Sequence, residues 1–180
     1  RKAELEELIL ALAAPYQQEL AILQTAPGIS SGFTAIGIIS EIGTNMEAFP
    51  SAKHLCSWAG LTPTNNESAG KKKSVRVSKA GCYIKPLLVQ CANAVVKSKK
   101  HPEIRNRYLR LKKRRGHKKA IIAVARMLLT ALYHMLKNGE NYNAELYRKS
   151  DLPPIDCEIT VEQALIIARN QGYRIKSATA

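Results

Sequence analysis

Apolar residues recur three or four positions apart over residues 4–24, which predicts a helix with one apolar stripe. Pro15 lies inside this segment and is expected to kink or break the helix near Ala14. The pattern therefore predicts a helical arm over residues 1–24. Its stripe consists of Leu5, Leu8, Leu12, Tyr16, Leu20 and Leu23.

Several later segments also carry helix signals. Residues 118–137 form the longest of them, with Gly139 ending the helix. Helices are also expected from about residue 30 to 41, at 52–58 after a capping Ser51, and at 83–98, whereas 102–115 is either a basic helix or an extended arm. The buried stripe expected in 118–137 consists of Ile121, Ala125, Leu128, Leu132 and Met135.

Strand signals are sparse, and residues 75–77 are the best candidate for a short β-ribbon. Residues 62–70 are predicted to form a polar loop. Thr160 and Gln163 form a capping box for a last helix after Pro153 and Pro154. The expected fold is mainly α, with residues 25–150 as one domain and residues 151–180 as a C-terminal helical tail.

The positive charge is concentrated in one part of the chain. The formal net charge is +14, and residues 71–119 hold 18 of the 28 Lys and Arg residues but one acid, Glu103. A solvated surface usually mixes signs, so this block predicts a polyanionic partner, with nucleic acid the first candidate. The longest apolar stretch, residues 120–136, is interrupted by Arg126 and His134 and is expected to be too short to span a bilayer. No membrane partner is expected.

Leu23-x-x-x-Pro27-Gly28-Ile29, followed by a helix rich in small residues, is typical of a helix-hairpin-helix. Such a hairpin leaves amides at the start of its second helix free to hold one phosphate, and Gly28 and Ser30 are the candidate contacts. An ordinary helix–helix turn that uses Pro and Gly as punctuation is the alternative.

Ser68 is the candidate nucleophile, in a loop of small residues that runs into a cluster of cations. A serine oxygen attacks phosphorus if it is deprotonated and the developing negative charge is neutralised. Glu67 is a candidate base, and an ordinary turn residue is the alternative interpretation of Ser68. The segment from Asn65 to Lys72 is not a P-loop, because it lacks the first Gly and the final Ser or Thr. The nearby cations are Lys71, Lys72, Lys73, Arg76 and Lys79.

The four cysteines have no regular spacing, which favours reduced, buried or idle thiols in a cytosolic protein. His54 and Cys56 are close in sequence, but no second ligand pair follows, so no metal site is expected. The chain begins at Arg1 rather than Met, and we interpret it as a fragment of a longer protein.

A dozen ordered blocks over roughly residues 8–150 resemble the C-terminal transposase domain of the insertion-sequence one-ten family. These enzymes are DEDD transposases, described as bridge-RNA-guided serine recombinases. The blocks include Pro27-Gly28-Ile29, Ser40-Glu41-Ile42-Gly43, Leu55-Cys56-Ser57-Trp58-Ala59-Gly60-Leu61-Thr62-Pro63, Asn65-Asn66-Glu67-Ser68-Ala69-Gly70-Lys71, Ser78-Lys79-Ala80-Gly81, Arg114-Arg115-Gly116 and Leu132-Tyr133-His134-Met135-Leu136.

The resemblance implies a function and several partners. The family's serine nucleophile matches Ser68, and the family's N-terminal RuvC-like domain, absent here, holds Mg²⁺ with four acidic residues. Family members work as oligomers, joined through a coiled-coil arm, on donor and target DNA paired by a structured RNA. This implies a cytoplasmic, nucleoid-associated enzyme in a bacterium or archaeon. The expected DNA contacts are Gly28, Ser30, Lys71, Lys72, Lys73, Arg76, Lys79, Lys85, Lys112, Lys113, Arg114 and Arg115.

Two departures from the family pattern stand out: Cys82 follows Gly81, and Lys85 replaces a common Arg, keeping the charge but losing the bidentate phosphate geometry. The fragment alone is expected to be inactive. Two alternatives remain, a non-catalytic helix-hairpin-helix module that holds nucleic acid and a structural assembly domain driven by the leucine-striped arm.

Overall fold

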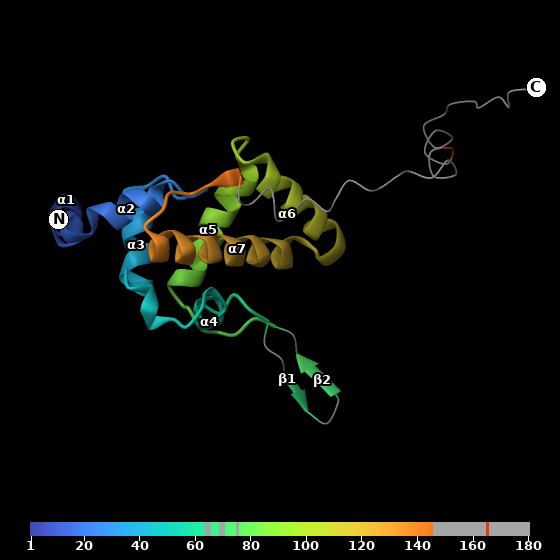
Figure 1. Cartoon of the computed structure of the whole chain (residues 1–180). Coiled ribbons are helices and arrows are strands. Elements are labelled where there is room, and N and C mark those ends of the chain that lie inside the picture. The colour runs from blue at the N-terminus through green and yellow to red at the C-terminus, as the bar shows by residue number, and fades with distance from the viewer. Residues whose placement is uncertain (64–65, 69–70, 75, 146–164, 166–180) are drawn as a thin grey trace, which may run out of the picture. The chain divides into compact units, whose positions relative to one another are not determined.

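The core of the fold is built around one long helix, α7. The computed structural model of the chain (Figure 1) describes residues 1–63, 66–68, 71–74, 76–145 and 165, with residues 66–68 and 71–74 described by their backbone. Helices α2, α4, α5 and α6 all pack against α7. The predicted class, mainly α with a short β-ribbon, is confirmed. The helices are α1 (Lys2–Ala13), α2 (Gln17–Gln24), α3 (Gly32–Ile42), α4 (Ala52–Trp58), α5 (Ile84–Lys97), α6 (Pro102–Arg115) and α7 (His117–Asn138).

The predicted stripe of α7 is buried throughout, and Gly139 ends the helix in the left-handed conformation with φ +66°. The helix is longer than the apolar stretch of residues 120–136 suggested. At 22 residues, α7 is long and apolar enough by composition to cross a membrane, which corrects the sequence prediction that the stretch is too short. Because four other helices cover it, its apolar face serves as the core.

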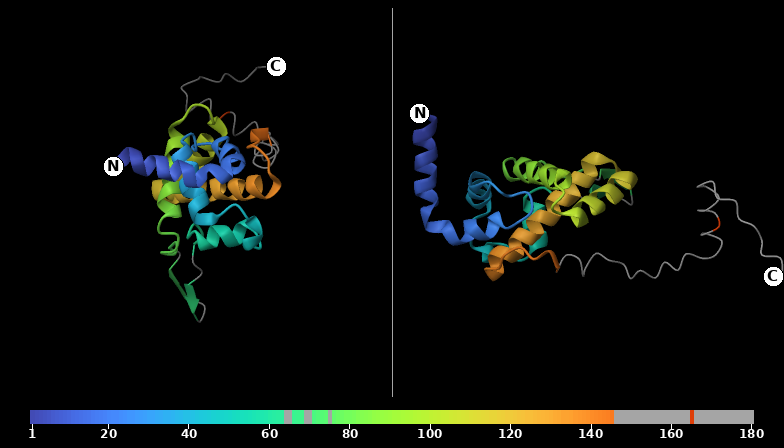
Figure 2. Two further views of the ribbon diagram at one scale, coloured as in Figure 1. Left: turned by 90° about the vertical axis from the view of Figure 1, so that its left-hand side faces the viewer. Right: turned by 90° about the horizontal axis from the view of Figure 1, so that it is seen from above.

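The N-terminal arm is divided at Pro15, as predicted. A 3₁₀ turn, η1 (Ala14–Tyr16), separates α1 from α2, and after it the chain changes direction, which Figure 2 shows from two sides. Leu20 and Leu23 of α2 are buried against α3 and α7. The leucines of α1 lie outside the core, since Leu5, Leu8 and Leu12 are all more than half exposed.

Residues 25–31 connect α2 to α3 in a turn that packs on α5. Gly28 has φ +81°, and a Cβ built on it would lie 2.6 Å from the carbonyl oxygen of Cys91 in α5. Ser30 is exposed on the same turn. Gly28 therefore allows two backbones to approach closely, and phosphate binding by a helix-hairpin-helix at this turn stays a prediction.

The β-ribbon lies earlier in the chain than predicted. β1 (Asn66–Ser68) pairs antiparallel with β2 (Lys71–Ser74), so residues 66–68 of the expected polar loop form a strand. Val77 forms an isolated bridge with Pro63, and Val75 lies outside the described residues. The predicted ribbon at residues 75–77 rested on the β-branched residues there. Antiparallel pairing through the backbone does not require such residues.

The remaining helices confirm the sequence prediction with small changes. α4 and α5 match the predicted segments within a residue, and residues 102–115 form a helix rather than an extended arm. Ser51 precedes α4, but its hydroxyl lies 2.9 Å from Nδ1 of His54 instead of capping a backbone amide. α3 is followed by a second 3₁₀ turn, η2 (Met46–Ala48).

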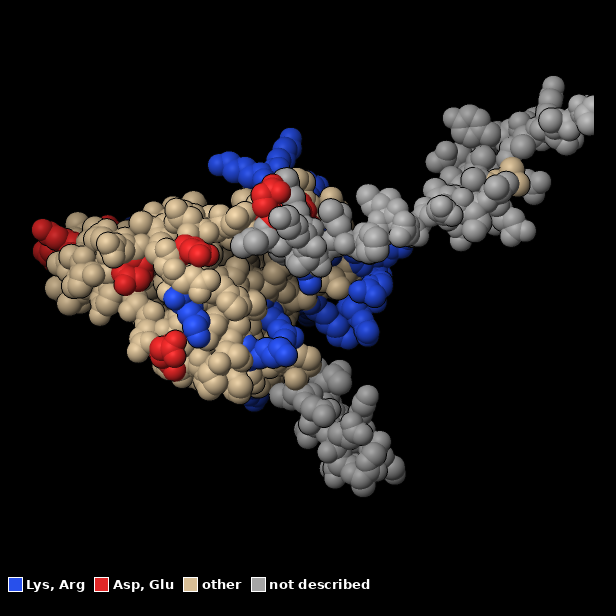
Figure 3. All heavy atoms as spheres, viewed as in Figure 1, with Lys and Arg blue, Asp and Glu red and all other residues tan. Residues whose placement is uncertain are grey.

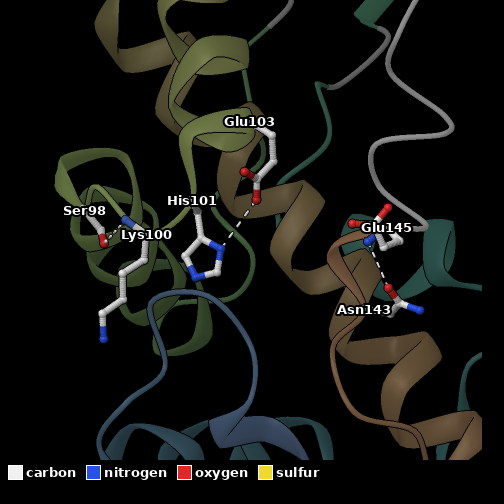
Figure 4. A network of polar contacts seen from close by, with 6 residues as sticks. All are labelled: Ser98, Lys100, His101, Glu103, Asn143 and Glu145. Carbon is white, nitrogen blue, oxygen red and sulfur yellow. Dashed lines mark hydrogen bonds and ion pairs between the residues drawn. The ribbon is translucent and has the colours of Figure 1, made fainter.

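The chain divides into two units, residues 1–142 and 143–180. Of the second unit, the structure describes residues 143–145 and Leu165, which is helical. In its first residues the amide of Glu145 donates to Oδ1 of Asn143 at 2.9 Å (Figure 4). The predicted capping box of Thr160 and Gln163 lies outside the described residues.

Gly28 gives a test of this packing. Gly28→Ala is expected to lower the free energy of unfolding by about 2–4 kcal/mol, since the new methyl group would collide with the Cys91 carbonyl at a backbone conformation that disfavours L-residues. Gly139→Ala is the matched control, because Gly139 has φ +66° and nothing lies within 4 Å of its added Cβ. The control is expected to cost about 1 kcal/mol. Urea denaturation followed by circular dichroism measures both, and equal losses would mean that the turn does not depend on this contact.

Candidate nucleic-acid interface and catalytic hairpin

The densest group of cations lies where α6 ends and α7 begins. Lys112, Lys113, Arg114 and Arg115 close α6, and Lys118 and Lys119 follow at the start of α7; all six are exposed. We call these six residues the cationic corner. In Figure 3 one group of Lys and Arg side chains lies at the right, around this end of the helical body, and others lie at the top and in the middle, whereas most of the acidic side chains lie toward α1 at the left.

The cationic corner is electrostatically costly for the free protein. Cations at the end of α6 are favoured by its helix dipole, but Lys118 and Lys119 lie at the positive end of α7. The one acid of the basic block, Glu103, does not neutralise the corner, because its carboxylate lies 3.4 Å from Nδ1 of His101 at the other end of α6 (Figure 4). A bound polyanion would relieve this repulsion between like charges.

A buried tyrosine fixes the corner in space. Tyr108 is 8% exposed, and its hydroxyl lies 2.8 Å from Nδ1 of His117, the first residue of α7. The ammonium of Lys112 lies 5.9 Å from the centre of the Tyr108 ring, within the range of a cation–π interaction. Tyr108 therefore packs rather than stacks on a base, whereas Tyr83, the other aromatic residue of the block, is 73% exposed.

The candidate nucleophile lies on the β1–β2 hairpin. Ser68 is the last residue of β1, and its Cα partner across the ladder is Lys71, the first residue of β2. Lys72 is paired with Glu67. The backbone thus brings the serine directly opposite the first residue of the lysine strand, and cations beside a serine oxygen can offset negative charge that develops on a phosphate. In Figure 1 the two strands extend from the helical body beyond α4.

The other predicted contacts have different surroundings. Arg76 and Lys79, which follow the hairpin, are exposed. Lys85 is half-buried in the first turn of α5, and its ammonium donates to the carbonyl oxygen of Ser78 at 2.6 Å. The structure therefore gathers the predicted cations in two groups, at the cationic corner and along the hairpin with its exit.

Two glycines at the root of the hairpin carry no functional role in the sequence prediction, which gives Gly60 only the end of the helix over residues 52–58. Gly60 and Gly81 have φ +65° and +66°, and each lies against the backbone of the other's segment. The sequence shows only that a glycine lies on either side of the hairpin. It does not show which backbone segment each glycine approaches.

The two buried cysteines that the structure describes, Cys56 and Cys91, are not activated thiols. Burial raises the pKa of Cys91 to about 11 and also raises the pKa of Cys56, whose Sγ faces the carbonyl of Arg126. Thiols with raised pKa stay protonated near neutral pH and are poor nucleophiles. Cys82 is exposed. In the part of the chain that the structure describes, no three His, Cys, Asp or Glu side chains form a group able to hold a metal ion.

Fold and surface together define a basic, mainly α-helical domain with its cations outside the core. The chain belongs to the IS116/IS110/IS902 family of transposases, whose sequence model matches residues 20–109, half of its length. It is 28% identical over 127 residues to an uncharacterized 43.6 kDa protein of the insertion element IS110 from Streptomyces coelicolor. That match covers 69% of the chain but 30% of the relative. No solved structure matches the chain.

The cationic corner gives a quantitative expectation for nucleic-acid binding. If the residues of the corner contact phosphates, binding of DNA releases counterions. Replacing Lys112, Lys113, Arg114 and Arg115 by Gln would then lower the number of counterions released on binding by up to four. The slope of log K against log salt for duplex DNA should then become less steep by about 3–4. Fluorescence anisotropy from 50 to 300 mM salt measures this slope.

A control of equal charge separates the corner from net charge. Lys53, Lys97, Lys99 and Lys100 are also exposed and lie outside the corner, so their replacement by Gln should change the slope by about 1 or less. Equal changes in the two variants would mean that the corner is not the contact surface.

Proposed function

We propose that this chain is the C-terminal catalytic and DNA-binding domain of an insertion-sequence transposase, with Ser68 as the nucleophile for DNA cleavage and strand exchange. Membership of the transposase family supports the class of enzyme. One observation carries the finer proposal: the hairpin sets Ser68 directly opposite Lys71, at the start of a strand with three consecutive lysines.

The proposed reaction is a transesterification. The Ser68 oxygen attacks the scissile phosphorus, an O–P bond forms, and the bond from phosphorus to the leaving deoxyribose oxygen breaks. The serine proton passes to a base, for which Glu67, the preceding residue of β1, is the candidate, and the leaving oxygen takes up a proton. Lys71, Lys72 and Lys73 offset the negative charge that develops on phosphorus. Attack by another DNA hydroxyl on the phosphoserine then rejoins strands and frees the serine.

Magnesium belongs to another part of the proposed enzyme. The family resemblance implies a RuvC-like domain that holds it with four acidic residues, and no step of the serine chemistry is routed through it. The isolated chain is accordingly expected to bind DNA without cleaving it. The relative from Streptomyces coelicolor is long enough to hold further domains, since the match covers 30% of it.

The binding partners of the proposed enzyme are donor and target DNA and a structured guide RNA. The cationic corner, with Arg76 and Lys79 at the hairpin exit, would hold their phosphate backbones without reading sequence. Gly28 and Ser30 would add one phosphate contact at the start of α3. Such an enzyme would act in the cytoplasm, on DNA of the nucleoid.

A non-catalytic module that holds nucleic acid is the second candidate. The observation that favours it is the cationic corner, which lies on α6 and α7 and needs no chemistry at the hairpin to bind a duplex. The two functions differ in their dependence on one oxygen atom of Ser68.

Ser68→Ala tests that difference. In the full-length transposase with its RNA and Mg²⁺, this change should reduce cleavage and strand exchange by at least about 10³-fold, because the attacking oxygen is lost. DNA affinity should stay within about twofold, since the cations remain. Ser74→Ala, a serine in the paired strand, is the control and should keep its activity. A protein–DNA adduct that maps by mass spectrometry to Tyr83 instead of Ser68 would overturn the serine mechanism.

Assembly through α1 is a separate expectation. Leu8 and Leu12 are 55% and 69% exposed, and an exposed apolar helix favours pairing with a second copy. Leu8→Glu with Leu12→Glu should convert a dimer to a monomer in sedimentation. Gln17→Glu with Gln18→Glu adds the same charge on exposed positions of α2 and should leave the dimer intact. Deleting residues 1–24 is a poorer test, because it also removes the buried Leu20 and Leu23.

A further inference from the structure

The two segments that enter and leave the hairpin cross at its root in backbone contact. A Cβ on Gly60 would lie 2.5 Å from the carbonyl oxygen of Ala80, and a Cβ on Gly81 would collide with Ala59. Beyond the crossing, Pro63 and Val77 form an isolated antiparallel bridge. The glycines therefore let the segments meet. The entering segment is held to α4, since the amides of Gly60 and Leu61 donate to the carbonyl oxygens of Ser57 and Cys56 at 3.0 and 2.9 Å.

Lys85 adds a side-chain link from the leaving segment to α5. Its side chain passes over Gly60, where an added Cβ would lie 2.9 Å from Cε and 2.8 Å from Nζ. Its ammonium then donates to the carbonyl oxygen of Ser78 at 2.6 Å, and its own amide donates to the carbonyl oxygen of Gly81 at 3.0 Å. One residue of α5 thus contacts both the entering and the leaving segment. α5 itself packs against α3, α6 and α7.

The location of this lysine is unfavourable unless the ammonium has a negative partner. Lys85 is the second residue of α5, where the helix dipole disfavours a cation, and its side chain is half-buried. A partly desolvated ammonium needs acceptors, and the Ser78 carbonyl is one. The Ser78 hydroxyl in turn accepts from the amide of Ala80 at 3.3 Å, which holds the leaving segment in its turn.

The geometry points to Lys85 as a positioning residue that ties the root of the β1–β2 hairpin to α5 and thereby sets where Ser68 is presented. This inference rests on the proposed function of Ser68. It differs from the sequence prediction, in which Lys85 is a DNA contact. A displacement of about 1 Å at a reacting atom is enough to lower a rate about 100-fold, so a small shift at the root would be visible in catalysis.

The test compares Lys85→Met, Lys85→Arg and Lys79→Met. Lys85→Met keeps the aliphatic stem but loses the donor, and strand exchange by the full-length transposase should fall about 10- to 100-fold. Lys85→Arg restores a donor to the Ser78 carbonyl and should recover the rate to within about threefold. The slope of log K against log salt should not change in Lys85→Met, whereas the exposed Lys79→Met should flatten it by about 1.

A readout independent of catalysis accompanies these rates. In the 180-residue chain, Lys85→Met should shift the backbone amide resonances of residues 66–68 and 71–74, and Lys85→Arg should leave them near their original positions. If Ser68→Ala remains active, the proposed function fails, and these resonances still decide whether Lys85 holds the hairpin. If Lys85→Met does not fold, Lys85→Gln replaces it in both measurements.

Two results would overturn the inference. A flattened salt slope in Lys85→Met, with a rate loss that saturating DNA restores, would make Lys85 a DNA contact. Unchanged rates and unchanged hairpin resonances would make the Ser78 hydrogen bond incidental.

Discussion

The rest of the structure depends on the burial of the apolar face of α7. Leu128, Leu129 and Leu132 are at most 1% exposed, and four helices that precede α7 in the sequence pack against it. This burial removes a large apolar area from water, which is the main favourable term in folding. It also fixes the direction of α4, α5 and α6, so both candidate sites are attached to elements that α7 orients.

Packing in the core of this protein holds surface cations close together despite their mutual repulsion. Six cations around one helix–helix connection repel one another, and the folded chain keeps them together because Ile104 and Tyr108 hold α6 on α7. An arrangement that is unfavourable for the free protein but built on a rigid base is typical of a site prepared for a ligand of opposite charge. The same reasoning applies to Lys85, whose location in the first turn of α5 is understandable only from its partner.

The sequence predicted the helices well because their signals are local. The stripe of α7, Gly139 at its end and the break at Pro15 each follow from spacing or from one residue's backbone chemistry. The predicted position of the ribbon was wrong because a short antiparallel pair of strands can form between polar residues through the backbone alone. The roles of Gly28 and Gly60 escaped prediction for another reason. Each is defined by a segment far along the chain, Cys91 for the first and Ala80 for the second. In the same way, the sequence marked Lys85 as a cation, but only the fold reveals the Ser78 carbonyl beside it.

The separation of charge along the molecule has a consequence for encounter with DNA. Glu4, Glu6 and Glu7 belong to α1, whereas the cationic corner lies at the far end of the helical body in Figure 3. Such a distribution gives the domain a large electric dipole moment in addition to its net charge. In the field of a nucleic acid, that moment exerts a torque that turns the cationic end forward before contact. For the DNA-binding function proposed above, the acidic end would then trail, and α1, the surface proposed for assembly, would face away from the DNA.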